Sequence, residues 1–500
     1  MLQSQFVGLT PPPWTNPAPP ARFFCRGRPQ VKWILPGSRP RLRRPVARAV
    51  HSFEGHPPED TKPSAMQRVL VVGGGCTGAC AAMLLRKKLG PDASIEIWEK
   101  ARGFGGRMTT TRQDVAGETI RADVGAQYLS ADLSDPTSKE LIDMLLTRKV
   151  VAEVGGEKGP GAKGLCSTPE RQSGGSWHHF AGLEGGVNSA LKCLADQAQA
   201  TAYFEKRVAS MDPVAGGKWR VRPFTGAPET FDAVLFAVPG CGVGGDNIDK
   251  IHGGWENLID EECNRQLRSP QHDHRHAVVL FLAPEHLQAC EAFFGPSNIE
   301  AQIDDDMVHL LAYQSRKTAC IGGPVSKSPV VVVHTTHEFS RRNQRAGGRD
   351  RPFLEAVAGR VVHEYLKIPK GVRLDNIVLG SKVITWKQCQ ITRSMKGPAA
   401  FPLCKPLSDD PPLVLAGDYF TNSSFTGCAM SAANAVSALS SMLKGEKIAN
   451  AVATASSAKR PADSDDGGYG KGQGKGKDSK GGKGKGKKGG KAEQGYRERY

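Results

Sequence analysis

The chain has 500 residues, of which 39% are hydrophobic, and a formal net charge of +17. This length can hold two or three domains with sizeable cores, but the charge lies mainly at the ends, with about +7 in residues 1–65 and about +7 in 459–500. Because the middle carries only about +3, the basic composition describes the tails and not a basic folded domain. No apolar run reaches the roughly 18 to 20 residues that span a bilayer, so no transmembrane segment is expected.

The N-terminal end, residues 1–65, has the composition of a disordered leader. Residues 1–53 contain no Asp or Glu, several Arg and many Pro, and such a segment cannot bury a core. An acid-poor, Arg-rich leader is typical of an organellar transit peptide, which would direct the protein to a mitochondrion or plastid. A plain extension, or a start at Met66, would instead leave it in the cytoplasm.

The C-terminal end, residues 451–500, is predicted to be a disordered tail rich in Gly and Lys. A solvated polycation attracts phosphate backbones or anionic surfaces without reading sequence. Its three tyrosines are too few and too far apart to form a stacking platform for bases. Nonspecific polyanion binding, or no function, is therefore favoured over a nucleic-acid-binding module.

The twelve cysteines are scattered without Cys-x-x-Cys pairs or metal-ligand spacing. They are interpreted as reduced packing residues, and no metal site is predicted. Cys76 and Cys80 lie one helical turn apart, so a redox role is an open but less favoured alternative.

A glycine-rich turn joins an apolar strand, residues 69–73, to an Ala/Leu-rich helix expected over 76–89. In this Gly-x-Gly-x-x-Gly pattern, Gly73 makes the tight turn and Gly75 lets the backbone approach a pyrophosphate. Gly78 lets the helix pack closely on the strand. The amides that open the helix would hold the anion.

An acidic residue is expected about 20 residues after such a turn, at the end of a second strand. The strand predicted over 94–99 ends at Glu99, whose carboxylate would accept hydrogen bonds from ribose hydroxyls. Three glycines alone can occur by chance in a chain with 58 glycines. The strand, helix and acid together predict a dinucleotide site.

Alternating strand and helix signals continue from Met66 to about Asn450. The expected elements are strands at 204–208, 218–221, 231–239, 276–282, 329–335 and 413–418 and helices at 354–366 and 428–444. The runs at 276–282 and 329–335 suggest an antiparallel sheet. The final strand and helix form a second strand-to-helix unit, which suits the long cofactor FAD better than NAD and implies an inserted domain.

The predicted fold class is α/β, with an FAD-binding Rossmann-type domain, an inserted α+β substrate domain on a mixed or antiparallel sheet, and disordered tails at both ends. The predicted division is leader 1–65, FAD-binding parts 66–140, 186–245 and 396–450, substrate-domain parts 141–185 and 246–395, and tail 451–500.

Further motifs give the chain a family resemblance over roughly 66–445. They are Arg102-Gly103-Phe104-Gly105-Gly106-Arg107-Met108-Thr109-Thr110, Asp123-Val124-Gly125-Ala126-Gln127-Tyr128, Val333-His334-Thr335-Thr336, Trp386-Lys387, Ala416-Gly417-Asp418 and Ser424-Phe425-Thr426-Gly427-Cys428. The first resembles the second fingerprint of the FAD-dependent amine oxidase superfamily. Together and in this order, the motifs resemble those of renalases.

The resemblance implies FAD as cofactor and an oxidase reaction. Renalases oxidise dihydro isomers of NAD(P) to the ordinary nicotinamide cofactor and pass electrons through flavin to molecular oxygen, which yields hydrogen peroxide. The cofactor-binding residues predicted on this basis are Gly73, Gly75, Thr77, Gly78, Glu99, Lys100, Gly106, Arg107, Met108, Gln127, Val208, Gly417, Asp418, Gly427 and Cys428.

Individual roles follow from residue chemistry. The glycine turn, Glu99 and Arg107 would bind the ADP half of FAD, with Arg107 near the pyrophosphate; a surface salt bridge is its alternative. Asp418 would hydrogen-bond the ribityl chain at the carboxyl edge of the sheet. A helix starting near Gly427 and Cys428 would point its positive end toward the ring system.

The predicted catalytic residues are Gln127, Tyr128, His334 and Trp386, which would line the space over the flavin ring. Hydride transfer needs positioning more than acid or base help. His334 as a hydrogen-bonded core histidine, and Trp386 as a core aromatic, are alternatives of similar weight. Lys387 as a flavin-facing lysine is less favoured.

Two other functions stay open. The first is another flavin oxidase of the same fold, acting on an amine or on a carotenoid or porphyrin precursor, with Cys404 or Cys428 as a candidate flavin-linking cysteine. The second is a flavin-bound scaffold whose basic tail tethers it to RNA or to a membrane.

Overall fold

The structure is a computed structural model that describes residues 66–154, 176–239, 251–323, 325–347 and 350–447. Contacts divide the chain into residues 1–64 and 65–500, and every described residue belongs to the second unit. The predicted leader, 1–65, and the predicted tail, 451–500, lie outside the described residues, as do 448–450 at the end of the predicted FAD-binding part.

A six-stranded sheet carries the glycine-rich turn. Its order is β20 (Lys405–Asp409), β21 (Pro412–Leu415), β12 (Ala233–Phe236), β1 (Arg68–Val72), β2 (Ser94–Trp98) and β8 (Thr201–Tyr203). Five strands are parallel, and β20 pairs antiparallel with β21. The predicted strand-to-helix units at the two ends of the sequence therefore lie close together in one sheet, which confirms the Rossmann-type fold.

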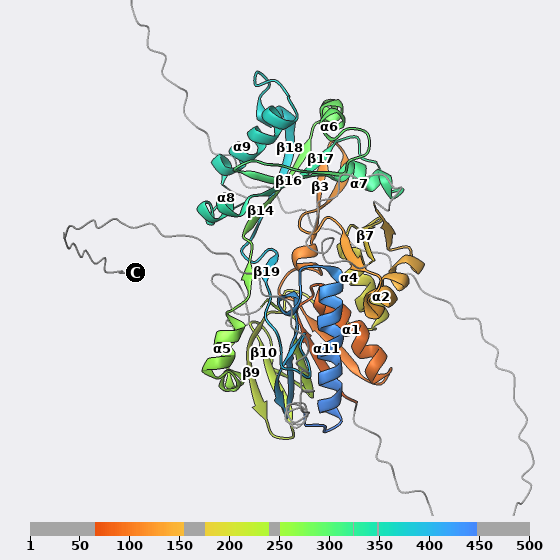
Figure 1. Ribbon diagram of the computed structural model, residues 1–500, viewed down its shortest axis with the longest axis vertical. Coiled ribbons are helices and arrows are strands. Elements are labelled where there is room, and N and C mark those ends of the chain that lie inside the picture. The colour runs from red at the N-terminus through yellow and green to blue at the C-terminus, as the bar shows by residue number, and fades with distance from the viewer. Residues whose placement is uncertain (1–65, 155–175, 240–250, 324, 348–349, 448–500) are drawn as a thin grey trace, which may run out of the picture. The chain divides into compact units, whose positions relative to one another are not determined.

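Both faces of this sheet are buried, as expected for a parallel sheet. Val69 and Val71 of β1 pack toward helices α1 (Cys76–Leu89) and α11 (Phe425–Leu443). Leu70 and Val72 pack on the opposite face. Figure 1 shows α1 and α11 side by side along the sheet.

A small antiparallel sheet covers that opposite face. Its strands are β9 (Val208–Val214), β10 (Lys218–Pro223) and β11 (Glu229–Phe231). Trp219 and Phe231 from these strands share a core with Leu70 of β1. Helix α5 (Glu261–Leu267) contributes Leu267 to the same core.

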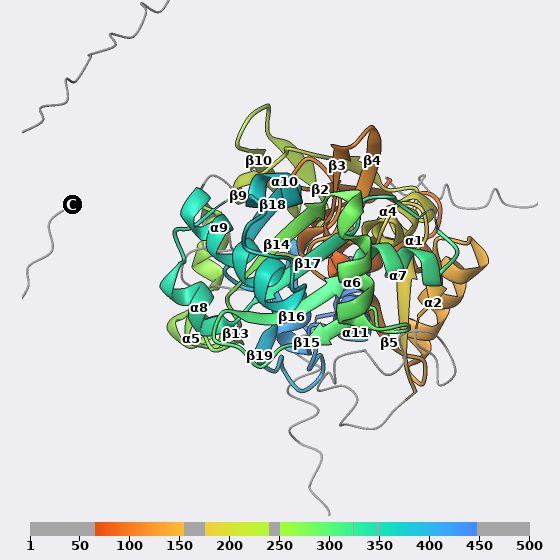
Figure 2. The ribbon, with the colours of Figure 1, turned by 90° about the horizontal axis from the view of Figure 1, so that it is seen from above.

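A five-stranded antiparallel sheet forms the second half of the described structure. Its order is β15 (Glu300–Gln302), β16 (Val308–Tyr313), β17 (Val330–Thr335), β14 (Arg275–Leu282) and β18 (Val378–Trp386). The predicted antiparallel pairing of the segments 276–282 and 329–335 is confirmed by β14 and β17. Figure 2 looks onto this sheet from the side of helices α6 (Leu287–Phe294) and α9 (Arg351–Gly359).

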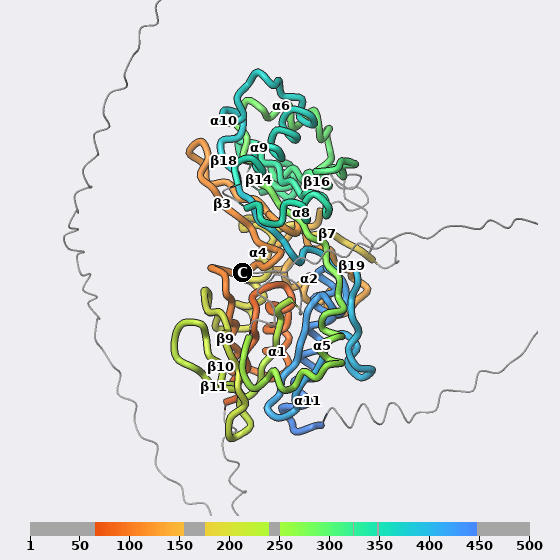
Figure 3. The backbone as a smooth tube through the Cα atoms, turned by 90° about the vertical axis from the view of Figure 1, so that its left-hand side faces the viewer, coloured from red at the N-terminus to blue at the C-terminus, as the bar shows by residue number. Residues whose placement is uncertain are grey.

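The two faces of β14 pack against different partners. Val278 and Leu280 share a core with α6, α9 and the π-helix η5 (Arg360–Tyr365). Val279 and Phe281 instead pack with the hairpin β3 (Thr110–Val115) and β4 (Glu118–Asp123). The hairpin thus extends from the nucleotide-type half onto the inserted sheet, as the tube in Figure 3 shows for β3 beside β18.

A three-stranded sheet lies against the core of the nucleotide-type half. It consists of β5 (Leu129–Asp132), β7 (Trp177–Gly182) and β6 (Val151–Glu153), and helices α2 (Pro136–Thr147) and α4 (Asn188–Gln197) accompany it. Leu141 and Leu145, one turn apart on α2, are buried in the core of α1 and β1. The predicted boundary at 140/141 therefore falls inside a helix that packs with the first half.

The short elements complete the described chain. They are η1 (Gly106–Met108), η3 (Gly254–Leu258), β13 (Gln271–His272), η4 (Pro284–His286), α7 (Gln314–Cys320), α8 (His337–Arg342), α10 (Leu374–Ile377), β19 (Ile391–Arg393) and η6 (Asp418–Phe420). None of the helices in the described ranges is long and apolar enough to span a membrane. The nine cysteines among the described residues are all free thiols.

Two element predictions need correction. The strand expected at 204–208 is instead the connection between two strands, because β8 ends at Tyr203, Glu205 has a positive φ of 55° and β9 begins only at Val208. The last helix begins at Phe425 and not at Cys428, because the Ser424 hydroxyl accepts a hydrogen bond from the amide of Gly427 at 2.9 Å and caps it.

We predict that Gly78→Ala destabilises the fold. A Cβ at Gly78 would lie 1.9 Å from the carbonyl oxygen of Gly73, so α1 would have to move away from β1, at a cost of about 1–3 kcal/mol or more. Urea unfolding of the two proteins measures this difference. Gly359→Ala is the matched control, because no described atom lies within 4 Å of its added Cβ. Equal stability of Gly78→Ala and the parent chain would contradict the close packing of α1.

Candidate active site

One large cavity lies where the two halves of the described structure meet. It has a volume of about 730 Å³, within the range of roughly 300–1,000 Å³ that is usual for ligand pockets. The turns after β1, β12 and β21 line it from the nucleotide-type half. Strands β16, β17 and β18 contribute residues from the inserted sheet.

The cavity brings together sixteen of the predicted site residues. They are Gly73, Gly75, Thr77, Glu99, Lys100, Gly106, Arg107, Met108, Gln127, Tyr128, Val208, His334, Trp386, Gly417, Asp418 and Cys428. Among the described residues, Gly78 and Gly427 are the predicted ones that do not line it. Gly78 contacts Gly73 instead, and Gly427 packs against the carbonyl of Asn422. The close packing of Gly78 is the role that its motif predicts, and Gly427 also has a packing role, while the binding roles of the other residues stay predictions.

The glycine turn leaves open backbone at the cavity. Gly73 has a φ of 110°, which favours glycine. A Cβ built at Gly75 meets no described atom within 4 Å, so the space beside this backbone is free for a ligand. Within the described residues no side chain caps the start of α1. Its first amides are therefore available for an anion.

Glu99 is oriented by its own neighbourhood. The side chain is 7% exposed. One carboxylate oxygen accepts from the amide of Gly74 and the other from the amide of Ala101, each at 2.7 Å. Since each oxygen can accept a second hydrogen bond, the carboxylate can still receive ribose hydroxyls.

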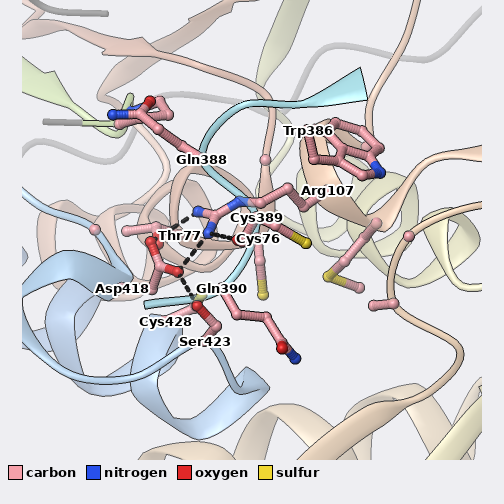
Figure 4. Close-up of a pocket in the computed structure, with 18 of the residues that line it drawn as sticks. Cys76, Thr77, Arg107, Trp386, Gln388, Cys389, Gln390, Asp418, Ser423 and Cys428 are labelled. Carbon is pink, nitrogen blue, oxygen red and sulfur yellow. Dashed lines mark hydrogen bonds and ion pairs between the residues drawn. The ribbon is translucent and has the colours of Figure 1, made fainter. Parts of the chain in front are cut away.

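Arg107 and Asp418 form a bidentate ion pair in the cavity wall (Figure 4). Two guanidinium nitrogens of Arg107 each lie 2.7 Å from a carboxylate oxygen of Asp418. The backbone carbonyl of Cys389 accepts another hydrogen bond from Arg107 at 2.7 Å, and Ser423 donates to Asp418 at 2.6 Å. Arg107 thus forms a salt bridge, as its alternative role predicted, but the pair is not a surface one, because the Asp418 side chain is 4% exposed.

Electrostatics at this pair favour both charges. Burial by itself would raise the pKa of Asp418, but the charge and hydrogen bonds of Arg107, with the hydroxyl of Ser423, lower it below its ordinary value. Among the described residues the cavity is lined by six Lys or Arg side chains and three carboxylates. An anionic ligand is therefore favoured.

His334 is an uncharged histidine in the cavity wall. Burial, the largest cause, lowers its pKa to about 4. Its Nε2 lies 2.9 Å from the carbonyl oxygen of Val124, and a carbonyl can only accept. Nε2 therefore carries the proton, and Nδ1 is left as the acceptor. His334 is thus hydrogen-bonded to the protein, as the core-histidine alternative predicts, and it also lines the cavity.

Trp386 ends β18 beside Arg107 in the cavity wall (Figure 4). Its indole nitrogen is buried and has no hydrogen-bond partner in the described part of the chain. Buried donors are usually paired, so this N–H is an unmet donor at the wall. Lys387, which follows it, also lines the cavity.

Gln127 lines the cavity, but its amide is used inside the protein. Its nitrogen donates to the carbonyls of Asp123 and Gly125 at 2.9 and 3.0 Å, and its oxygen accepts from Gln314. Because both amide atoms have protein partners, the protein holds this side chain in one orientation, and its catalytic role stays a prediction. Tyr128 donates to the carboxylate of Glu300 at 3.1 Å.

Several residues of the site had no strong signal in the sequence. The carbonyl of Cys389 and the hydroxyl of Ser423 complete the Arg107–Asp418 pair, and Arg275 and His309 line the inserted-sheet side. Only Ser423 lies next to a recognised motif. Arg275 and His309 lie on strands of the inserted sheet and Cys389 follows β18, and no local sequence pattern connects these three residues.

The residues present fit a dinucleotide cofactor. The open backbone at Gly75, the uncapped helix among the described residues and the oriented carboxylate of Glu99 suit a pyrophosphate and a ribose. The excess of cationic side chains suits the same anion.

Comparisons with known proteins agree with this geometry. A family model described as an NAD(P)-binding Rossmann-like domain matches residues 71–145. Renalase of Mus musculus is 26% identical over 379 residues, which cover 75% of this chain and 99% of the mouse protein. These findings support the resemblance to the renalase-like flavin amine oxidases and indicate a flavin-dependent oxidoreductase.

We predict that Asp418→Asn weakens the fold by about 3 kcal/mol at pH 7, because it leaves the charge of Arg107 uncompensated in a largely buried place. The lowered pKa of Asp418 also adds stability that is complete above the unfolded value of about 4 and is lost as pH falls through the folded value. The variant should lack this part of the acid dependence. Urea unfolding between pH 3 and 7 tests both statements.

Asp143→Asn is the matched control for this substitution. Asp143 pairs with Lys139 at 2.6 Å, but both side chains are more than half exposed. Its loss should change stability by less than about 1 kcal/mol. Equal effects of the two substitutions on the free energy of unfolding would show that the Arg107–Asp418 pair stabilises the fold no more than an exposed ion pair does.

Proposed function

We propose that this renalase-like flavin-dependent oxidoreductase binds FAD and oxidises dihydro isomers of NAD(P). In this reaction the substrate gives up a hydride and becomes NAD(P)⁺, and oxygen receives the two electrons and the proton of that hydride, together with one proton from water, to give hydrogen peroxide. The bound flavin supplies the two-electron acceptor that links these half-reactions. The observation that carries the proposal is that one cavity is lined both by a dinucleotide-type turn and, from the inserted sheet, by uncharged His334 and Trp386.

The nucleotide-binding end supports FAD as the cofactor. The turn at Gly75 and the carboxylate of Glu99 offer a pyrophosphate and a ribose their usual partners. Asp418, which follows the strand β21, and its partner Arg107 line the same cavity. The match of a complete mouse renalase to 75% of the chain supports the same cofactor.

The inserted-sheet side of the cavity supports hydride transfer from the substrate, because the histidine that lines it is uncharged. His334 holds its proton on Nε2 against the Val124 carbonyl, so it is neither a free acid nor a positive charge at pH 7. Hydride transfer needs the donor carbon placed at the acceptor and little proton movement. His334 and the flat indole of Trp386 can form the walls that orient a planar substrate.

The first experiment mixes the purified full-length chain, loaded with FAD, with 2- and 6-dihydro isomers of NAD or NADP without oxygen. We expect rapid bleaching of the flavin absorbance and formation of ordinary NAD(P)⁺. Admission of oxygen should restore the colour and produce hydrogen peroxide in equal amount. A yellow protein that stays oxidised would overturn the proposed substrate.

In that case we would test whether the protein is an amine oxidase of the same fold, with primary amines and polyamines as substrates.

Of the two candidate flavin-linking cysteines, Cys404 is fully buried in the core of α1 and α11 and, within the described residues, does not line the cavity. Cys428 does line it, but a hydrogen bond with the Cys76 thiol, together with burial, raises the pKa of Cys428. A thiol that resists ionisation is a poor nucleophile for a covalent link.

We predict that His334→Gln combined with Trp386→Phe slows anaerobic flavin reduction by about 100-fold, because both walls of the substrate space change shape. Stopped-flow absorbance measures the reduction rate at saturating substrate. The flavin spectrum should stay that of a bound cofactor, since the glycine turn and Glu99 are untouched. The control is His252→Gln, whose side chain is 73% exposed. An unchanged rate with normal flavin binding would remove both residues from the reaction.

A further inference from the structure

A buried ion pair behind the cavity joins the inserted sheet to the segment that carries Gln127. Lys317 lies on α7 and, within the described residues, does not line the cavity. Its ammonium donates to the carboxylate of Asp123 and to the backbone carbonyl of Gln127, each at 2.8 Å. The two charged side chains are only 5% and 4% exposed.

The carboxylate of Asp123 also collects donors from the nucleotide-type half. Its other oxygen accepts from the hydroxyl of Thr110 at 2.6 Å and from the amide of Val187 at 2.9 Å. Thr110 begins β3, and Val187 directly precedes α4. Asp123 is therefore a junction at which α7 meets two elements of the other half.

A second residue of α7 supports the same segment. The side-chain oxygen of Gln314 accepts from the amide of Asp123 at 3.0 Å, and its nitrogen donates to the side-chain oxygen of Gln127. Gln127 in turn donates to the carbonyls of Asp123 and Gly125. The amide chain and the ammonium of Lys317 thus hold residues 123–127 at several points.

The segment held in this way also receives His334. The His334 ring donates to the carbonyl of Val124, which lies between Asp123 and the cavity-lining residues Gly125 to Tyr128. A shift of the segment would therefore move the ring of His334 and the side chain of Tyr128 together. Both line the substrate end of the cavity.

A buried ion pair is an expensive way to stabilise a core, because both charges lose their hydration and an apolar pair often serves as well. Its directional hydrogen bonds do, however, define one register of the segment against the inserted sheet. We propose that Lys317 is a positioning residue for hydride transfer, acting through Asp123 and the Gln127 carbonyl on His334 and Tyr128; the role rests on the proposed function.

The test replaces Lys317→Met and Asp123→Asn together. The double variant removes both charges at once, so no unpaired charge stays buried, and Asn keeps an oxygen for Thr110 and Val187. We expect folded, FAD-containing protein whose flavin-reduction rate at saturating dihydro-NAD(P) isomer falls by about 10- to 100-fold. The concentration for half-saturation should change far less. The visible circular dichroism of the bound flavin should also change, because it reports the contacts around the ring.

The matched control is Arg360→Met with Asp305→Asn, an ion pair of 2.7 Å on the inserted sheet's side. Its carboxylate is 7% exposed and accepts hydrogen bonds from the amides of Met307 and Val308. Within the described residues neither partner lines the cavity. This variant should keep the parental reduction rate and dichroism, even if it lowers the melting temperature.

Three results would overturn the role of Lys317. They are a parental reduction rate in the Lys317–Asp123 variant, an equal fall of the reduction rate in the control variant, and a failure of the parent chain to bind flavin at all.

If the parent binds flavin but the dihydro isomers do not reduce it, only the proposed substrate is overturned. The dichroism then decides for Lys317, with an unchanged spectrum counting against it. If the double variant does not fold, Lys317→Arg supplies the decision, because a retained cation should preserve at least part of the parental dichroism.

Discussion

The ion pair between Arg107 and Asp418 is the contact on which the cavity depends, because it joins segments 311 residues apart in the sequence. Arg107 follows the second glycine fingerprint, and Asp418 follows the last parallel strand, β21. Since Asp418 is almost fully buried, water cannot easily replace its partner. The Cys389 carbonyl, which also accepts from Arg107, ties the chain that returns from β18 to the same point. A segment near the beginning of the described chain and two segments near its end therefore meet at one guanidinium.

Local signals account for what the sequence could predict. The strand, glycine turn and helix at Gly73 to Gly78 are contiguous, and Glu99 lies one strand further on, so composition and spacing were enough to predict them. The strand that ends before Asp418 was predictable for the same reason. Parallel strands place their carboxyl ends at one edge of the sheet. The sequence alone therefore predicts that the glycine turn and Asp418, which follow two such strands, lie at the same edge.

Long-range contacts account for what the sequence could not predict. The end of β8 at Tyr203 depends on a positive φ at Glu205, for which that residue type gives no warning. Helix α2 belongs to the core of α1 and β1 because Leu141 and Leu145 are buried there. An amphipathic pattern predicts that such a helix face is buried, but not which element it packs against. Lys317 would ordinarily be read as a solvated helix residue, because its partner Asp123 is 194 residues away.

The hairpin β3–β4 explains how two sheets with separate cores can share one cavity. Its apolar side chains, such as Ile120, pack on the inserted sheet, while its base continues from Arg107 and ends at Asp123. The amide of Ala126 donates to the Arg107 carbonyl at 2.9 Å, and a Cβ at Gly125 would clash with that same carbonyl at 2.0 Å. The glycine-turn side and the inserted-sheet side of the cavity are thus connected through a few backbone contacts. Substitutions in the inserted sheet can therefore alter its side of the cavity through this base and leave the glycine turn as it is.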